Sequence, residues 1–307
     1  MIPLLPAPSL GIDIGGSKTQ AVLLDEQARI VADHVRPTEV GSDGVIATAL
    51  AAARGCVQLA GIGFGDLRGV GVGIPGRVDH PTGVVHTAVN LGLGRLPLGE
   101  RLGELIGVEV RVDNDVKATL LGVAHRLDAH DADLSYVNFG TGVAAATLAG
   151  GRLVRGSDNL AGEIGHIPVR PGVGRCACGQ DGCIEVLAGG AQITRRLSRL
   201  RPAVSLSTLM AAASDGHREA AAVADLAASG IADAVQLVVL AQGSDRVVIG
   251  GGVIQTAPEL ADLARQLLVG RARGSAFLAS LDLPGRLVVA PPEQPLAAVG
   301  AALLVRC

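Results

Sequence analysis

The stretch Ser9-Leu-Gly-Ile-Asp-Ile-Gly-Gly-Ser-Lys-Thr-Gln-Ala-Val-Leu-Leu24 contains two short apolar runs joined by a glycine turn. Its Lys18-Thr19 pair is similar to the end of a P-loop, but a P-loop has glycine directly before the lysine, where this chain has Ser17. A P-loop also leads into a helix, whereas residues 20–24 are typical of a strand. The stretch therefore predicts a tight β-hairpin whose glycine amides approach phosphate oxygens. An ordinary hairpin with a turn-capping aspartate is the alternative.

Glycine turns of this kind recur at the ends of later predicted strands. Asp13, at the end of its buried strand, can hold Mg²⁺ through water. Three glycine turns at strand ends fit a nucleotide clamped between two lobes. The candidate phosphate-binding residues are Asp13, Gly15, Gly16, Ser17, Lys18, Thr19, Gly140, Thr141, Gly142, Gly250, Gly251 and Gly252.

The order of strand, glycine turn and strand occurs twice. Residues 9–35 contain three β-like runs, and residues 134–154 repeat them about 125 positions later. Strands are also expected at 69–75, 108–112 and 246–249, and helices at 44–60, 98–107, 208–213, 217–241, 258–272 and 294–305. This alternation predicts two α/β lobes with a cleft between them. We expect an N-terminal lobe over 1–115, a C-terminal lobe over 116–292, and a C-terminal helix at about 293–307 that packs back on the first lobe.

Composition excludes several classes of partner. The 307 residues carry 26 basic and 29 acidic side chains without a basic tail, so nucleic acid is a poor candidate partner. No apolar span of about 20 residues and no signal peptide are recognisable, which predicts a cytoplasmic protein that does not bind membranes. With no Trp, one Tyr and three Phe, hydrogen bonds must hold any polar ligand.

Asn114-Asp115 lies at a predicted junction between a strand and a helix that starts near Val116. Asp115 can accept a proton from a hydroxyl group, and the helix N-terminus favours a phosphate nearby. A plain N-cap is the alternative for this pair.

His166, Cys176, Cys178 and Cys183 lie within 18 residues and have the composition of a tetrahedral zinc site. Four protein ligands leave no open position, so the zinc knot at 166–183 is expected to be structural. A disulfide is not expected in a cytoplasmic chain.

Glu163 and Glu185 lie on either side of this motif. Carboxylates beside a zinc-bound histidine are directed acceptors for vicinal hydroxyl groups, and the second nitrogen of His166 stays available. The alternative is that both are ordinary surface glutamates.

Taken together, these segments resemble the ROK (repressor, open reading frame, kinase) sugar kinases over nearly the whole length. The family's fold is the two-lobed actin-like, hexokinase-like ATPase fold, an α/β duplication of ribonuclease-H-like domains. The motifs that carry the resemblance are Asp13-Ile-Gly-Gly-Ser-Lys-Thr19, Gly73-Ile-Pro-Gly76, Asp113-Asn-Asp115, Gly140-Thr-Gly142, Leu160-Ala-Gly-Glu-Ile-Gly-His166, Cys176-Ala-Cys-Gly-Gln-Asp-Gly-Cys-Ile-Glu185 and Val248-Ile-Gly-Gly-Gly252.

The resemblance implies transfer of the γ-phosphoryl group of ATP to a hexose hydroxyl, with O6 of glucose as the first choice and Asp115 as the general base. It also implies Mg²⁺ with ATP, a structural Zn²⁺ and a homodimer. The implied sugar ligands are Asn90, Asn114, Asp115, Glu163, His166 and Glu185.

Alternatives within the family are an N-acetylmannosamine, N-acetylglucosamine or fructose kinase, and a sugar sensor without catalysis. A family repressor would add a helix-turn-helix domain before the first glycine turn, and only a dozen residues precede Asp13.

Lys117 departs from the family pattern, which more often has a small neutral or amide residue there. Three roles are open for it: it can lower the pKa of Asp115, contact phosphate or point to solvent. The sequence Leu120-Leu-Gly-Val123 also lacks the glutamate that usually follows this glycine.

Overall fold

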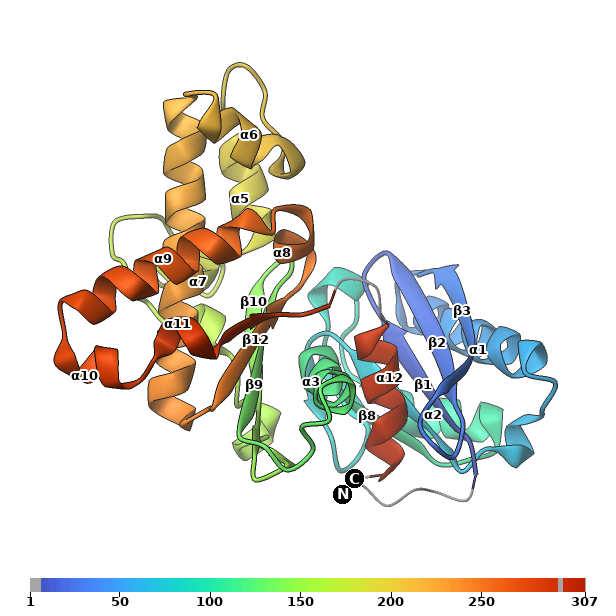
Figure 1. The fold of residues 1–307 in the computed structure, drawn as a ribbon. Coiled ribbons are helices and arrows are strands. Elements are labelled where there is room, and N and C mark those ends of the chain that lie inside the picture. Colours follow the sequence, from blue (N-terminus) through green and yellow to red (C-terminus); the bar gives the residue numbers. More distant parts are fainter. Residues whose placement is uncertain (1–6, 292–294, 307) are drawn as a thin grey trace. The chain divides into compact units, whose positions relative to one another are not determined.

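The computed structural model describes residues 7–291 and 295–306, and Figure 1 shows its helices and strands. Its contacts divide the chain into two compact units, each of which is described separately. Unit 1 comprises Met1–Asp131, Gly151–Ala161 and Glu293–Cys307, and unit 2 comprises Ala132–Gly150 and Gly162–Pro292.

These limits differ from the expected division at residues 115 and 292. Helix α3 (Asp115–Arg126) belongs to unit 1 because it packs along α12 (Leu296–Leu303), and the segment 151–161 also returns to unit 1. Of the expected C-terminal helix, residues 293, 294 and 307 lie outside the described residues.

Unit 1 is built on a five-stranded sheet in the order β3-β2-β1-β4-β8. The first three strands are antiparallel, and β4 and β8 continue parallel to β1. The parallel part is buried on both faces, which explains why Gly69-Val-Gly-Val-Gly-Ile74 is apolar throughout. The strands are β1 (Ser9–Ile14), β2 (Lys18–Leu24), β3 (Ile30–Pro37), β4 (Gly69–Ile74) and β8 (Val110–Asn114).

Helices cover both faces of this sheet. α1 (Ser42–Leu59) and α2 (Leu98–Ile106) share a core with Leu10, Ile12 and Val72 of the strands. α12 contacts β1 and β4 from the other face and lies beside α3. A Cβ on Gly300 of α12 would overlap the Ala118 carbonyl of α3, so these two helices pack with their backbones in contact. A small sheet of β5 (Arg77–Asp79), β6 (Val84–Thr87) and β7 (Leu96–Pro97) precedes α2.

Unit 2 repeats the strand arrangement of unit 1. β10 is antiparallel to β9, and β12 and β13 follow parallel to β9, as β2, β1, β4 and β8 do in unit 1. The predicted duplication is therefore confirmed. The strands are β9 (Leu134–Phe139), β10 (Val143–Ala149), β12 (Arg246–Gly250) and β13 (Leu287–Val289), and a short β11 (Arg152–Leu153) lies in the segment 151–161.

The core of unit 2 is formed largely by the long helix α7 (Arg218–Gln242), which packs against α9 and α4. The expectation that the chain has no apolar span of about 20 residues was wrong for α7, which is long and apolar enough to cross a membrane by length and composition. However, 67% of its most apolar window is buried inside the protein, which accounts for its apolar composition. The other helices are α4 (Ile184–Ala188), α5 (Gly190–Leu197), α6 (Leu209–Ser214), α8 (Gly252–Thr256), α9 (Glu259–Arg273), α10 (Ala276–Ser280) and α11 (Leu283–Arg286). Short 3₁₀ turns occupy Phe64–Asp66, Val89–Leu91, Ser157–Asn159, Ile164–His166, Leu206–Thr208 and Leu304–Arg306.

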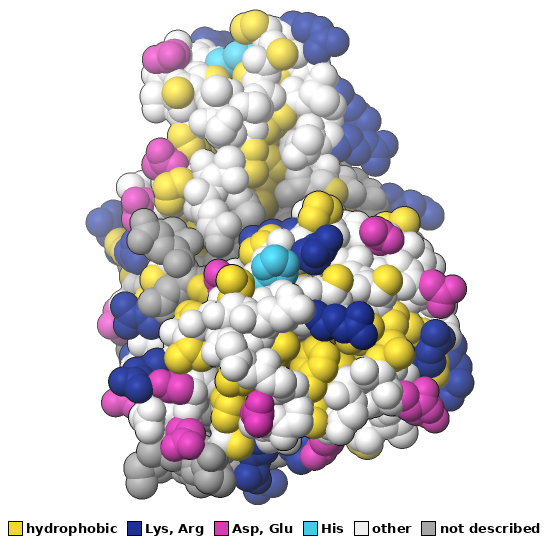
Figure 2. Space-filling view, turned by 90° about the vertical axis from the view of Figure 1, so that its right-hand side faces the viewer, with side chains coloured by type: hydrophobic (Ala, Val, Ile, Leu, Met, Phe, Trp, Pro, Cys, Tyr) yellow, Lys and Arg dark blue, Asp and Glu magenta, His cyan; other side chains and the backbone are white. Residues whose placement is uncertain are grey.

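Basic and acidic side chains are scattered over the face drawn in Figure 2. No continuous basic stripe of the kind that tracks a nucleic-acid backbone crosses this face.

Candidate active site

The first glycine turn is a β-hairpin, as predicted. Gly15 N donates to Lys18 O at 2.9 Å and closes the turn between β1 and β2. Gly16 and Ser17 are exposed, so their amides are accessible to a ligand. Thr19 is buried instead, and its hydroxyl group shares a 2.9 Å hydrogen bond with that of Thr38. The turn therefore offers backbone amides, while the Thr19 side chain serves the hairpin itself.

Asp13 lies at the end of β1, partly buried. It is level with Gly73 of β4, and Gly73 is level with Asp113 of β8. Burial and the negative charge of Asp115 raise the pKa of Asp13 to about 7, which the positive charge of Lys18 only partly offsets. Two carboxylates thus meet at one end of the sheet, an arrangement that a bound cation would stabilise.

Asn114, rather than Asp115, caps helix α3. Its Oδ1 accepts hydrogen bonds from Val116 N at 3.0 Å and Lys117 N at 3.4 Å, and its Nδ2 donates to Gly76 O at 3.3 Å. Asp115 is the first residue of α3 and is partly buried. The plain N-cap that was the alternative for this pair thus applies to Asn114, and the helix does not need the Asp115 side chain as its cap.

A buried ionic network lies directly before this helix, and two of its members, Arg155 and Asn159, were not predicted from the sequence. Asp113 Oδ2 lies 2.9 Å from both Nε and Nη2 of Arg155. Its Oδ1 accepts from Asn159 Nδ2 at 2.9 Å and from Asn114 N at 2.8 Å. Because Asp113 is fully buried, this pairing compensates a charge that water cannot reach.

Lys117 is only 2% exposed, so it does not point to solvent. Its Nζ donates to Asn159 O and to Ala161 O, both at 3.0 Å. The lysine therefore anchors the segment that leads out of unit 1 into Gly162 and Glu163.

Asn90 lies in the 3₁₀ turn Val89–Leu91, between β6 and β7 of the small sheet of unit 1, and is exposed. It lies beside the first glycine turn, since a Cβ on Gly16 would come within 3.9 Å of the Asn90 Cβ. Asn90, Asp13 and Asp115 are therefore brought to the same unit.

The second glycine turn, in unit 2, is closed by Gly140 N, which donates to Gly142 O at 3.0 Å. Glu185 Oε2 accepts from Val143 N at 3.2 Å, and a Cβ on Gly142 would overlap that oxygen. Glycine at 142 is thus required for the Glu185 carboxylate to reach this turn. The turn also binds the start of α5, because Gly190 N donates to Gly140 O at 2.9 Å.

The third glycine turn lies next to the second. Gly251, at φ 91°, follows β12, and a Cβ there would overlap the Phe139 carbonyl at the end of β9. The residues Gly140–Gly142 and Gly250–Gly252 therefore meet at the same end of the unit 2 sheet.

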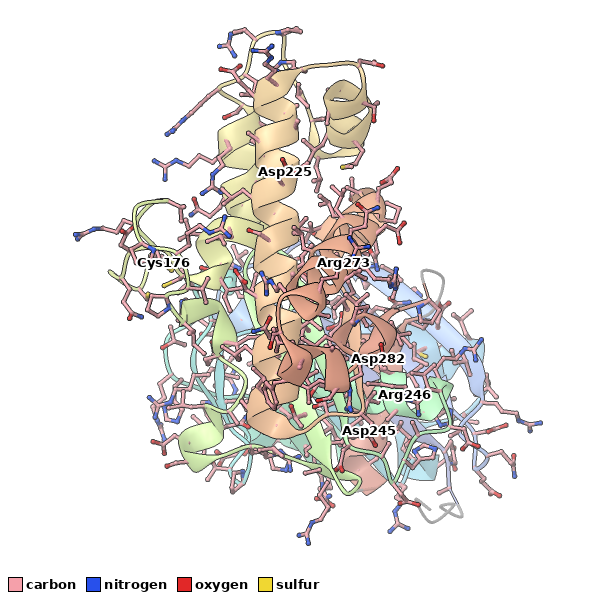
Figure 3. All side chains as sticks on the ribbon, turned by 60° about the vertical axis from the view of Figure 1, so that its left-hand side comes forward. Cys176, Asp225, Asp245, Arg246, Arg273 and Asp282 are labelled. Atoms are coloured by element: carbon pink, nitrogen blue, oxygen red, sulfur yellow. The ribbon has the colours of Figure 1, made fainter. Side chains whose placement is uncertain are left out.

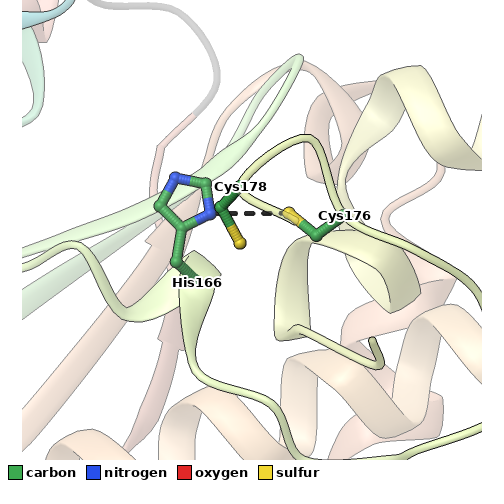
Figure 4. Close-up of side chains that lie close together, drawn as sticks. All are labelled: His166, Cys176 and Cys178. Carbon is green, nitrogen blue, oxygen red and sulfur yellow. Dashed lines mark hydrogen bonds between the residues drawn. The ribbon is translucent and has the colours of Figure 1, made fainter. Parts of the chain in front are cut away.

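His166, Cys176 and Cys178 have ligand atoms that all lie within 4.8 Å of one another. Figure 4 shows the three side chains close together. His166 Nδ1 lies 3.5 Å from Cys176 Sγ, and Cys178 Sγ lies 3.7 Å from Cys183 Sγ. A tetrahedral zinc ion with ordinary bond lengths would separate its ligands by roughly 3.6 Å (N to S) and 3.8 Å (S to S). The donor set and the spacings fit zinc, with Cys183 outside the group of three.

The three thiols of the motif differ in pKa when no ion is bound. Hydrogen bonds from the backbone and side chain of Gln180 lower the pKa of the Cys178 thiol to about 6, which favours its thiolate, whereas burial raises the pKa of the Cys176 and Cys183 thiols.

Glu185 and Glu163 differ in how firmly they are held. Glu185 Oε1 lies 3.8 Å from Cys176 Sγ, so one carboxylate contacts both the His/Cys cluster and the glycine turn. Glu163 is exposed and precedes the 3₁₀ turn that carries His166.

Comparison with known proteins gives four informative similarities. The chain is 30% identical over 270 residues to a glucokinase from Halalkalibacterium halodurans, covering 82% of both chains. It is 28% identical over 247 residues to an N-acetylmannosamine kinase from Salmonella arizonae, covering 80% of this chain and 83% of the relative.

Two solved structures share the fold. The ROK hexokinase from Thermus thermophilus superposes with a TM-score of 0.80 at 29% identity, over 96% of this chain and 97% of that one. A ROK family glucokinase from Streptomyces griseus, in complex with glucose and AMPPNP, gives a TM-score of 0.74 at 27% identity, over 97% and 99% of the two chains.

The family model for ROK proteins matches residues 9–307. The match spans both sheets, all three glycine turns and the His/Cys motif, and the chain accordingly belongs to the ROK family and has its two-lobed sugar-kinase fold.

Proposed function

We propose that this protein is an ATP-dependent hexose kinase in which Asp115 is the general base. The observation that carries the proposal lies at the start of α3. There the Asn114 side chain caps the helix, so Asp115, in the first turn, is not needed as the cap. Asp115 accepts the proton of the sugar hydroxyl while the hydroxyl oxygen attacks the γ-phosphorus and ADP leaves. Relatives that are glucokinases and bind an ATP analogue support this reaction.

The phosphates of ATP are bound by backbone amides of the three glycine turns. Gly16 and Ser17 supply amides in the exposed part of the unit 1 turn, whereas the Gly15 amide closes that turn by donating to Lys18 O. In unit 2 the amides come from Thr141, Gly142 and Gly250–Gly252, because Gly140 N donates to Gly142 O. Asp13 holds Mg²⁺, directly or through water. Without a cation, the negative charge of Asp115 repels the Asp13 carboxylate, and the bound ion would offset that repulsion. The ion neutralises phosphate charge when bound.

The proposed sugar-binding residues are Asn90 and Asn114 in unit 1, and Glu163, His166 and Glu185 in unit 2. His166 faces Cys176 through Nδ1, which leaves Nε2 for a hydroxyl group. A structural Zn²⁺ on His166, Cys176, Cys178 and Cys183 orients this histidine and the loop that leads to Glu185.

Glucose is the first choice of substrate and O6 the accepting hydroxyl. N-acetylmannosamine is the second candidate, because one of the relatives is an N-acetylmannosamine kinase of similar coverage. N-acetylglucosamine and fructose follow. We place the protein in the cytoplasm as a homodimer, in line with the family resemblance, and sedimentation of the purified protein tests the dimer.

An ADP-release assay with Mg-ATP over a panel of hexoses and N-acetylhexosamines tests the proposal. Asp115→Asn should lower kcat by about 10²–10⁴-fold on the accepted sugar, because a positioned base contributes that much. Asp225→Asn is the matched control, since Asp225 is exposed on α7 (Figure 3) and contacts none of these residues. Full activity of folded Asp115→Asn would overturn the assignment of the base, and no turnover on any sugar by the zinc-loaded wild type would favour a sugar sensor instead.

A further inference from the structure

A pocket in unit 2 is lined by residues of the His/Cys loop and of α5. It has a volume of about 260 Å³. All of its charged lining residues are arginines, and no carboxylate and no aromatic side chain contributes to it. The lining residues are Val173, Gly174, Arg175, Val186, Gln192, Arg195, Arg196 and Arg199. The set of Arg175, Arg195, Arg196, Arg199 and Gln192 is called the arginine pocket below.

The guanidinium groups of the arginine pocket have no anionic partner among the described residues, since none of the four forms an ion pair there. Asp181 pairs with Arg175 only through the backbone, in an isolated β-bridge. Its carboxylate accepts hydrogen bonds from Gly172 N at 2.6 Å and Gly174 N at 3.2 Å. The Asp181 carboxylate is therefore bound to backbone amides of the loop and forms no ion pair with the arginines.

Concentrating these cations has an electrostatic cost. Arg195 and Arg199 are four positions apart on and just after α5, where like charges destabilise a helix. Burial and the charge of Arg199 lower the pKa of Arg196. A bound anion would relieve this repulsion.

The chemistry of the pocket defines the anion. Guanidinium groups bind phosphate oxygens in pairs, with better geometry than a lysine ammonium group. The volume is below the roughly 300–1,000 Å³ of pockets for drug-sized ligands, and no ring is present on which a base could stack. We propose that the arginine pocket binds a compact phosphate-bearing anion: inorganic phosphate, pyrophosphate or the phosphate group of a sugar phosphate.

Two contacts connect this pocket to the candidate active site. Arg196 Nη1 donates to the carbonyl of Val186, the residue after Glu185, and its Nη2 donates to Val173 O. Arg175 directly precedes Cys176 in the sequence. An anion held by Arg175 and the α5 arginines therefore ties the His/Cys loop to α5, whose first residue bonds to the Gly140 turn. We expect that an anion in the arginine pocket changes the KM for the sugar, and this expectation rests on the proposed function.

Calorimetric titration of the zinc-loaded full chain with inorganic phosphate, pyrophosphate and glucose 6-phosphate, without ATP or sugar, tests the binding itself. The double variant Arg195→Gln/Arg199→Gln should bind the preferred anion at least about tenfold more weakly, and Arg218→Gln, an exposed arginine of α7 outside the pocket, should bind it as wild type does. Equal melting temperature and zinc content of the variants confirm their folding. The three titrants identify which source of phosphate is preferred.

Unchanged binding in the double variant would assign the anion to the glycine turns and overturn the proposal, as would absence of saturable binding of all three anions. The expected change in the sugar KM, present in wild type and absent in the double variant, is measured separately. A protein that binds the anion but phosphorylates no sugar would refute the proposed function while leaving the arginine pocket in place.

Discussion

Each unit contains a cluster of polar side chains near its glycine turns, and the two clusters differ in the partners of those side chains. In unit 1, the charge of Asp113 is paired with Arg155, and the Lys117 ammonium group donates to two backbone carbonyls. In unit 2, His166, Cys176 and Cys178 direct their ligand atoms at one another, at spacings that suit an ion between them. The charge of Asp113 in the first cluster is paired within the folded chain, whereas the second cluster would be completed by the Zn²⁺ proposed above. Removing the metal should therefore affect the unit 2 cluster and not the unit 1 cluster. Removing the charge of Asp113 should destabilise the unit 1 cluster whether or not a metal is bound.

The largest effect is expected from losing the metal. Structural zinc contributes about 10–16 kcal/mol of binding free energy in zinc-finger peptides, and here it would hold the loop that carries Cys176 and leads to Glu185. Cys178→Ser should reduce bound zinc to well below one per chain and lower kinase activity at least about tenfold. Elemental analysis and the ADP-release assay measure both.

Cys56→Ser is the control for this variant, because Cys56 is buried in unit 1 far along the chain from the motif. It should keep full zinc content. Rigorously zinc-free protein with unchanged activity would remove the distinction between the two clusters.

Asp113→Asn should have the next largest effect. It leaves the charge of Arg155 without its carboxylate partner in a buried site, which typically costs about 3–5 kcal/mol of unfolding free energy. Urea unfolding measures it, with and without a chelator, since this loss should not depend on metal. Adding Arg155→Met should recover part of the stability, and a double variant no more stable than Asp113→Asn would argue against a paired charge.

Lys117→Met should destabilise the protein by about 1–3 kcal/mol, because the methionine fills the space but leaves the carbonyls of Asn159 and Ala161 without their donor. Lys117→Arg keeps a donor and serves as the comparison. Stability is again measured in urea. If Met and Arg variants were equally stable, the two hydrogen bonds would contribute nothing measurable.

The smallest expected effect is the contribution of Asp13 to the pH dependence of the free energy of unfolding. Its folded-state pKa of about 7 lies above the ordinary value of 3.8, so the folded state binds the proton more tightly. Between about pH 4 and 7 this group's contribution to stability therefore falls as pH rises. Because Asp13 is only partly buried, we expect a change on the order of 1–2 kcal/mol.

Unfolding of wild type and Asp13→Asn at several pH values, without nucleotide or metal, isolates this contribution. The variant should show the flatter profile. An identical pH dependence in both would place the titration elsewhere, and added Mg-ATP should reduce the difference by favouring the carboxylate.

Sequence patterns predicted most of the fold because its strands and helices are regular in period. The hairpin at residues 9–24 followed from Ser17 and the β-like run after it, and the helix at 217–241 from its apolar spacing. The small sheet β5-β6-β7 was missed because its strands have only two to four residues. α4 and α5 were missed because they are short, with five and eight residues.

The candidate site was predictable where its residues are close in sequence. The spacing of His166, Cys176 and Cys178 indicated their cluster directly. The contacts of Asp113 with Arg155 and of Lys117 with Asn159 join residues about forty positions apart, and no periodic pattern marks them. Their charge alone does not indicate whether such side chains are buried, and only packing decides it.

The position of α12 has a consequence for how the protein is made. This helix follows unit 2 in the sequence, contacts β1, and packs on α3 where Gly300 meets the Ala118 carbonyl. During synthesis, the β1 face that α12 covers leaves the ribosome long before its partner, whereas the α7 core of unit 2 is complete earlier. Unit 2 can thus fold before unit 1 is complete, because the face of β1 that α12 covers stays exposed until α12 has been synthesised.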